Sequence, residues 1–164
     1  MKKNIILIII LVLIDQIIKI LAIKFLEPVG SVSLINGVLS LTYLENKGAA
    51  FGLWNSRWLL VGVNIAIIFV LIKLLRNKTY EFTKQMRTAY SLILAGGITN
   101  LIDRLFRGFV IDYIDVNELF YYPVFNIADI CIIIGILILV ITIVIKTLQK
   151  QEQNYETIQN RKHK

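Results

Sequence analysis

The sequence predicts an all-α membrane protein with four transmembrane helices and a small β-hairpin, or cradle, outside the membrane. Three observations lead to this prediction. Of the 164 residues 57% are hydrophobic, and the mean hydropathy is +0.71, whereas soluble domains are roughly 45–50% apolar. The apolar residues gather in four runs that are long enough, or nearly so, to cross a bilayer. The basic residues gather between these runs and at the chain ends, and so predict how the chain crosses.

The distribution of charge predicts the topology. The formal net charge is +7, and the regions 27–57 and 108–123 hold only Lys47 and Arg57 as bases. Twelve of the 18 basic residues lie at the ends or in the middle of the chain: Lys2, Lys3, Lys73, Arg76, Lys78, Lys84, Arg87, Lys146, Lys150, Arg161, Lys162 and Lys164. The positive-inside rule then places both termini and the middle loop in the cytoplasm. This basicity suits membrane lipids, and no nucleic-acid partner is expected.

The first span is predicted over residues 4–26. It begins like a secretory signal peptide, but its apolar run continues past Asp15 without a small-residue cleavage site, so we expect it to be retained. Asp15 and Lys19 are four residues apart, share one helix face and are expected to pair. They are either a self-neutralised pair or a support for a nearby functional site, and both interpretations stay open.

Residues 27–55 predict the outer β-cradle. Ser31–Ile35 and Val38–Tyr43 are β-prone runs, and Asn36-Gly37 between them is a strong hairpin signal. The Gly-rich segment from Glu45 to Gly52 follows, with Trp54 and Trp58 at the depth of the membrane interface. A hairpin of this kind can bind an extended peptide by strand addition. An ordinary outer loop anchored by tryptophans is the simpler interpretation.

The remaining spans are predicted over residues 58–75, 88–105 and 126–146. The basic cytoplasmic loop Arg76–Arg87 lies between the first two of these, and Gly96-Gly97 permits a close approach of helices in the second. Residues 1–148 therefore form one membrane-embedded domain. Residues 149–164 form a polar cytoplasmic tail, which we expect to be frayed or disordered and dispensable to chemistry.

Polar residues concentrate between Gly96 and Asp129, at the predicted outer membrane surface. They are Asn100, Asp103, Arg104, Asp112, Asp115, Asn126 and Asp129. Ionisable groups at a bilayer edge are costly and indicate function. Asn100 and Arg104 share one helix face, as do Asn126 and Asp129. The short connection between these two helices brings Asp112, predicted on a loop, close to Asp129.

This arrangement predicts acid–base chemistry by two carboxylates. When two carboxylates share one water, one keeps a proton, so the pair supplies a base and an acid for peptide hydrolysis. Asn100, Arg104 and Asn126 are expected to hold the carboxylates and the substrate backbone. Two other carboxylates are weaker candidates: Asp103 can pair with Arg104 or Arg107, and Asp115 is expected to be a solvated loop residue. Cation translocation is a rival use of the same groups.

Other catalytic and metal sites are disfavoured by composition. With one cysteine and one histidine, no Cys/His zinc site can form, and no metal or cofactor is expected. Cys131 lies in an apolar run without a nearby histidine, so we interpret it as a packing residue and not a nucleophile.

Five ordered blocks closely resemble the motifs of the bacterial lipoprotein signal peptidases (signal peptidase II), and the resemblance extends over nearly the whole chain up to the tail. They are Asp15-Gln-Ile-Ile-Lys19, Asn46-Lys-Gly-Ala-Ala-Phe-Gly52, Gly96-Gly-Ile-Thr-Asn-Leu-Ile-Asp-Arg104, Gly108-Phe-Val-Ile-Asp-Tyr-Ile-Asp115 and Phe125-Asn-Ile-Ala-Asp129. The resemblance implies four transmembrane helices with an extracytoplasmic cradle. It also implies an aspartic endopeptidase of the cell membrane that cuts diacylglyceryl-modified prolipoproteins before the lipidated cysteine.

The resemblance also implies roles for single residues. The family's catalytic aspartates fall on Asp112 and Asp129. Its supporting and substrate-binding positions fall on Asp15, Lys19, Asn46, Gly48, Asn100, Arg104 and Asn126. A monomer is expected. One departure is Thr99, where the family commonly has glycine before Asn100, and this bears on packing near the site.

Two rival functions remain beside a protease. A small transporter or channel subunit would use the buried aspartates and asparagines as ion ligands, but the chain shows no internal repeat and its polar groups lie at one membrane face. In a non-catalytic chaperone or lipid-binding scaffold, Asp112 and Asp129 would only stabilise helix packing.

Overall fold

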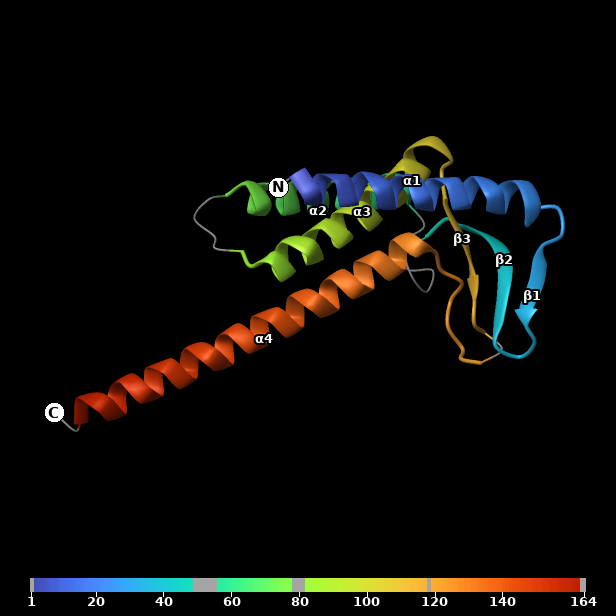
Figure 1. The fold of residues 1–164 in the computed structure, drawn as a ribbon. Helices are drawn as coiled ribbons and strands as arrows, with labels where there is room; N and C mark the ends of the chain where they lie inside the picture. Colours follow the sequence, from blue (N-terminus) through green and yellow to red (C-terminus); the bar gives the residue numbers. More distant parts are fainter. Residues whose placement is uncertain (1, 49–55, 78–81, 118, 163–164) are drawn as a thin grey trace.

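The computed structural model describes residues 2–48, 56–77, 82–117 and 119–162. Their elements are, in chain order, α1 (Lys2–Phe25), β1 (Ser31–Ile35), β2 (Leu39–Asn46), α2 (Arg57–Arg76), α3 (Lys84–Phe106), β3 (Val110–Asp115) and α4 (Ile127–Lys162). The start of α1, the start of α3 and the far end of α4 lie toward one end of the molecule, and the sheet lies at the other (Figure 1).

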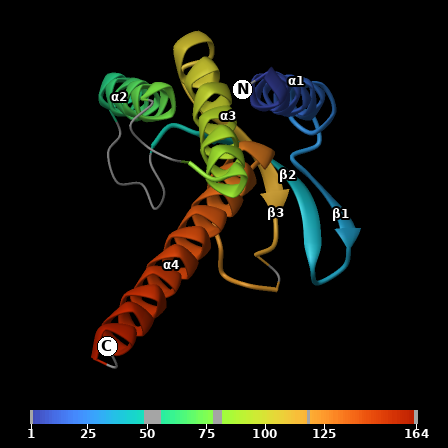
Figure 2. The same cartoon turned by 60° about the vertical axis from the view of Figure 1, so that its left-hand side comes forward.

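Helix α3 is the centre of the bundle. Helices α1 and α2 pack on opposite sides of it, and α4 crosses below (Figure 2). The buried residues of α3 are mostly small or polar, among them Ala89, Ala95 and Gly96. A Cβ on Gly96 would clash with the carbonyl oxygen of Ala128 on α4. Small residues at this crossing let the two backbones approach closely, as predicted for the glycine pair.

The outward faces of the other helices are apolar and exposed. Within the described residues, three helical stretches are long and apolar enough to cross a membrane: Lys2–Phe25, Arg57–Arg76 and Ile127–Tyr155. Helix α3 falls outside that group, since it carries the polar residues of the bundle's interior. The structure is therefore mostly helical, with three membrane-capable helices around a more polar one.

Three predicted helix boundaries are wrong. Arg76 belongs to α2 and Lys84–Arg87 belongs to α3, so the basic loop is shorter than expected. The reason is a cap, because the Thr83 hydroxyl accepts the Met86 N–H at 3.2 Å and starts α3 early. Helix α4 also continues to Lys162 instead of ending before a frayed tail. Hydrophobic patterns locate the membrane-facing part of a helix and miss polar turns that extend it.

The sheet is antiparallel, in the order β1-β2-β3. Its hairpin turns at Asn36-Gly37 as predicted, with Gly37 at φ 75° and the Val38 N–H donating to the Ile35 carbonyl at 3.0 Å. The third strand was not predicted, because residues 108–115 were interpreted as a loop. Strand β3 packs Ile111 and Tyr113 against Ala22 of α1 and against Leu26, which directly follows α1, and this contact fixes the sheet on the bundle. The predicted outer-loop residues 49–55 lie outside the described residues.

Candidate active site

The first carboxylate, Asp112, is held by the sheet. Strand pairing places Asp112 opposite Leu44 and Val110 opposite Asn46, so Asn46 and Asp112 are diagonal neighbours on one face. The Asn46 amide Nδ2 donates to Asp112 Oδ2 at 2.8 Å. The Gly48 N–H donates to Asn46 Oδ1 at 3.2 Å, which turns the amide nitrogen toward Asp112. Gly48 thus orients the residue that binds the carboxylate.

The chain that enters α4 is tied to the same strand. The Tyr113 and Ile114 N–H groups donate to the Phe125 carbonyl at 3.0 and 2.8 Å, and the Phe125 N–H donates back to Ile114 at 3.0 Å. This pairing places Asn126 beside Asp112. The fully buried Asn126 amide Nδ2 donates to Asp112 Oδ1 at 2.6 Å. Both oxygens of Asp112 therefore accept a hydrogen bond.

The second carboxylate, Asp129, lies in the first turn of α4 and shares a reciprocal cap with Asn126. Asn126 Oδ1 accepts the Asp129 N–H at 3.0 Å, and Asp129 Oδ2 accepts the Asn126 N–H at 3.2 Å. This is the capping-box arrangement, and the positive end of the helix dipole favours a carboxylate there. The Asn100 amide Nδ2 donates to Asp129 Oδ1 at 2.9 Å. Both oxygens of Asp129 are also held.

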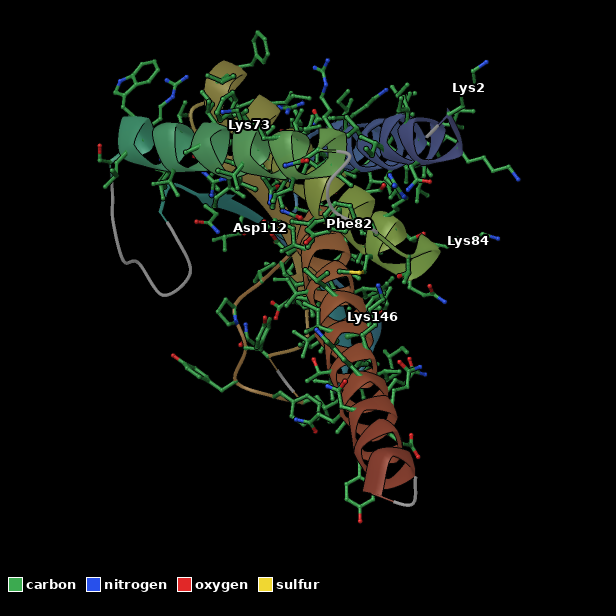
Figure 3. The ribbon with its side chains drawn as sticks, turned by 90° about the vertical axis from the view of Figure 1, so that its left-hand side faces the viewer. Lys2, Lys73, Phe82, Lys84, Asp112 and Lys146 are labelled. Atoms are coloured by element: carbon green, nitrogen blue, oxygen red, sulfur yellow. The ribbon has the colours of Figure 1, made fainter. Side chains whose placement is uncertain are left out.

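The two carboxylates line one cavity of about 270 Å³. Asn46, Gly48 and Arg104 also line it, and part of its wall is apolar, with Val124, Phe125, Ile132 and Ile133. Asp112 is only 1% exposed and Asp129 is half-buried. Figure 3 labels Asp112 within the body of the molecule, where the sheet meets the start of α4. Two fixed carboxylates and a guanidinium therefore face a single cavity with an apolar side.

The environment of Asp112 shifts its protonation. Burial, and then the nearby Asp129 carboxylate, raise the pKa of Asp112 to about 7, against the hydrogen bonds from Asn46 and Asn126 and the charge of Lys19. A carboxyl group with a pKa near neutrality can both hold and release a proton under physiological conditions. This is the property that acid–base catalysis requires of one member of a carboxylate pair.

Lys19 supports the site from behind. Its fully buried ammonium contacts Asp15 Oδ2 at 2.9 Å, Asp103 Oδ2 at 2.7 Å and Asn100 Oδ1 at 2.9 Å. Because Lys19 can only donate, it binds the Asn100 oxygen and leaves the Asn100 nitrogen facing Asp129. The predicted Asp15–Lys19 pair is confirmed. It neutralises buried charge, and Lys19 also orients Asn100, whose amide binds Asp129.

Asp15 also reaches the start of α4. Its Oδ1 accepts the Ala128 N–H at 3.2 Å, and its Oδ2 accepts the Thr99 hydroxyl at 2.6 Å. Thr99 in turn accepts the Gln16 amide at 2.8 Å. Sequence reasoning missed Gln16, although its place between Asp15 and Lys19 in an apolar helix was a signal. Thr99 does more than pack, because its hydroxyl fixes the orientation of the Asp15 carboxylate, which accepts an N–H from the first turn of α4.

Of the remaining candidate residues, one lines the cavity and three lie outside its lining. Arg104 lines the cavity, and its guanidinium donates to the Asn100 carbonyl at 3.4 Å. Asp103 is fully buried and forms the predicted ion pair with Arg107, away from the cavity lining. Asp115 ends β3 and accepts the Thr42 hydroxyl at 2.9 Å, so its assignment to a solvated loop is wrong. Cys131 is buried, as expected of a packing residue.

The family model and the similar curated proteins both point to one family of enzymes. The family model described as Signal peptidase (SPase) II matches residues 7–145. A lipoprotein signal peptidase of Thermodesulfovibrio yellowstonii is 45% identical over 84% of this chain and 92% of its own length. One of Caldanaerobacter subterraneus is 44% identical over 78% of this chain and 86% of its own. A solved bacterial membrane enzyme superposes with a TM-score of 0.83 at 29% identity and covers 92% of both chains.

Proposed function

The chain belongs to the signal peptidase II family, a family of aspartic proteases, and we propose that it removes the signal peptide from prolipoproteins with Asp112 and Asp129 as its catalytic pair. The main observation in support of this catalytic pair is that the two carboxylates line the same cavity. Asn126 connects them, since its amide nitrogen binds Asp112 and its amide oxygen binds the Asp129 N–H. The pair is therefore held in one geometry before substrate arrives.

The chemistry follows from one shared proton. The ionised carboxylate takes a proton from a water molecule, whose oxygen attacks the carbonyl carbon of the scissile peptide. The protonated carboxyl group donates its proton to the carbonyl oxygen, which gives a neutral tetrahedral intermediate. The intermediate collapses when a proton passes to the leaving nitrogen and the C–N bond breaks. The raised pKa of Asp112, about 7, keeps one proton on the pair at neutral pH.

Asn46, Asn100 and Asn126 supply donors that hold the carboxylates, through bonds of 2.8, 2.9 and 2.6 Å respectively. Arg104 is assigned to the substrate side of the cavity, where its guanidinium can bind a backbone carbonyl of the extended signal peptide. Asp15, Lys19 and Gly48 act through these residues as positioning groups. This division separates side chains that touch the reacting atoms from those that orient them.

The same proposal fixes the placement in the membrane. Helix α3 is the fourth transmembrane helix, stabilised by the three apolar helices around it. Both termini lie in the cytoplasm and the sheet lies at the outer surface, so the cavity opens at the outer leaflet. The apolar part of its wall, including Ile132 and Ile133, suits a substrate whose cysteine carries diacylglyceryl chains. The enzyme acts as a monomer and cuts before that cysteine.

The test is cleavage of a prolipoprotein by the purified protein in detergent, with mass measurement of the products. We expect cleavage directly before the lipidated cysteine, no cleavage of the same precursor without its lipid, and no effect of a chelator. If folded protein leaves the lipidated precursor intact, the proposed function is wrong and an ion-transport or scaffold role takes its place. If a chelator abolishes cleavage, the carboxylates act through a metal and the proposed pair is wrong.

A further inference from the structure

A second cavity lies at the other end of the bundle, far from the carboxylates. It is a groove of about 400 Å³ formed by α1, α2 and α3. Helices α1 and α2 pack on opposite sides of α3 (Figure 2). On α3 the groove begins at Arg87, seventeen residues before Arg104 of the active site, which corresponds to about 25 Å along a helix. The groove is thus a separate feature with no part in the proposed cleavage.

The wall of the groove is almost entirely apolar. Ile8 of α1, Ile72 of α2 and Leu94 of α3 are among its lining residues. Volumes of a few hundred Å³ with apolar walls are typical of ligand sites. Because the groove lies between helices and its wall is apolar, a flexible hydrocarbon chain suits it by shape and polarity.

The cytoplasmic mouth of the groove carries charge and hydrogen-bonding groups. Arg76 from the last turn of α2 and Arg87 from the first turn of α3 both line it. Asn4 also lines it and donates to the Ser91 hydroxyl at 3.1 Å. Among the described residues, neither guanidinium forms an ion pair with a carboxylate. The two guanidinium groups at the mouth therefore face no carboxylate of the residues that the structure describes.

The surrounding turns add positive charge. Figure 3 looks onto this end of the molecule and labels Lys2, Lys73 and Lys84 on the three helices that meet there. The first turns of α1 and α3 contain no acidic residue. Both turns are also the positive ends of their helix dipoles, where a cation is unfavourable and an anion is favoured. An anion bound at the mouth would relieve this concentration of positive charge.

We propose that this groove binds one anionic phospholipid of the cytoplasmic leaflet, with its phosphate between Arg76 and Arg87 and an acyl chain along the apolar wall. The proposal depends on the membrane placement given above and not on the identity of the catalytic pair. A guanidinium binds phosphate through two parallel hydrogen bonds. Basic clefts between helices at the cytoplasmic surface are suited to anionic head groups. A zwitterionic lipid would bring its own cation beside these residues and bind less well.

The experiment is native mass spectrometry of the whole protein released from micelles doped equally with phosphatidylglycerol and phosphatidylcholine of matched chains. The ratio of retained lipids is the readout. We expect retention of one phosphatidylglycerol, preferred by roughly 25-fold, because each of the two basic residues beside the anionic head group adds roughly fivefold. The double variant Arg76→Gln/Arg87→Gln should lower this preference to about twofold or less.

Two further variants make the result specific. Lys24→Gln/Lys150→Gln removes the same charge from exposed positions outside the groove and should keep the wild-type ratio. Arg76→Lys/Arg87→Lys keeps the charge and should keep most of the preference. The proposal is overturned if wild type retains both lipids equally, or if the two Gln double variants lose the preference equally. It also fails if the Lys variant behaves as the Arg→Gln variant does while its helix content is unchanged.

Discussion

Asn126 and Asp129 cap each other at the first turn of α4, each accepting the backbone N–H of the other at 3.0 and 3.2 Å. The same Asn126 side chain binds Asp112 on β3 at 2.6 Å. One residue thus sets the start of a membrane helix and the relation between the two carboxylates. A helix terminus is a suitable place for a carboxylate site, because its unpaired N–H groups and dipole fix the anion.

The first prediction concerns pH. Burial and the Asp129 carboxylate raise the pKa of Asp112 to about 7. A raised carboxyl pKa means that the proton is retained up to that pH, so the pair loses its acid as the pH rises through this value. We expect kcat/KM for a lipidated precursor to fall on the alkaline side with an apparent pKa of about 7. A profile that stays flat to pH 9 contradicts this assignment.

The second prediction concerns the pH at which this alkaline fall in kcat/KM occurs. The hydrogen bond from Asn46 stabilises ionised Asp112 and lowers its pKa. In Asn46→Ala this bond is lost, so the pKa of Asp112 rises and the alkaline limb of kcat/KM moves to higher pH. The matched control is Ser33→Ala, an exposed position on β1 of the same sheet, which should leave the limb in place. A shift toward lower pH in Asn46→Ala would be inconsistent with the bonding described.

The third prediction concerns the buried ammonium. In Lys19→Met the carboxylates of Asp15 and Asp103 lose a shared partner while both stay buried. Removing one member of a buried ion pair costs about 3–5 kcal/mol, and we expect the free energy of unfolding to fall by that amount in a denaturant titration in detergent. Lys24→Met removes an exposed charge from the same helix and should be nearly neutral. Equal effects of the two variants would argue against a stabilising role of the buried Asp15–Lys19–Asp103 contacts.

The fourth prediction concerns the α3–α4 crossing. A Cβ on Gly96 would meet the Ala128 carbonyl and lie 2.7 Å from Ile132 Cγ1, whereas one on Gly62 of α2 would meet nothing within 4 Å. Gly96→Ala should therefore destabilise the protein by about 1–3 kcal/mol and reduce cleavage, since Ala128 adjoins Asp129. Gly62→Ala should be neutral or stabilising, because alanine is the better helix former. The comparison is made by thermal unfolding and cleavage rate.

The fifth prediction concerns Thr99. Its hydroxyl donates to Asp15 and accepts from Gln16, and it is 1% exposed. Thr99→Val keeps the shape and leaves these buried partners unsatisfied, which should cost about 1–3 kcal/mol. The control is Thr142→Val, where the hydroxyl bonds only the Ile138 carbonyl of its own helix. If thermal unfolding shows the two variants to be alike, Thr99 contributes packing alone.

Local patterns predicted much of this architecture. The helical state of the four predicted runs, three of which are apolar enough to cross a membrane, is confirmed, and so are the Asn36-Gly37 hairpin and the Asp15–Lys19 pair. Each of these features depends on residues close together in the sequence. The pairing of Asn126 with Asp129 follows likewise from their i, i+3 spacing. These features are set by helix and turn periodicity, which a sequence displays directly.

The parts that were missed depend on contacts between distant residues. Strand β3 pairs with β2 across more than sixty residues, and this pairing, not a loop, positions Asp112 beside Asn46. The partners of Lys19 on α3 lie 81 or more residues away, and no local pattern shows that Asn100 links it to Asp129. Buried polar networks of this kind are specified by the fold as a whole.

The central claim is that Asp112 and Asp129 are the catalytic pair, and the most direct test compares three aspartate variants. Cleavage of a lipidated precursor is measured for Asp112→Asn, Asp129→Asn and Asp115→Asn, each checked for folding by thermal unfolding. Asp115 is the matched control, since it ends the same strand and binds Thr42 outside the cavity lining. We expect the first two variants to lose about 10²–10⁴-fold in rate and the third to stay near wild type. A folded Asp112→Asn or Asp129→Asn that cuts near the wild-type rate would contradict the account.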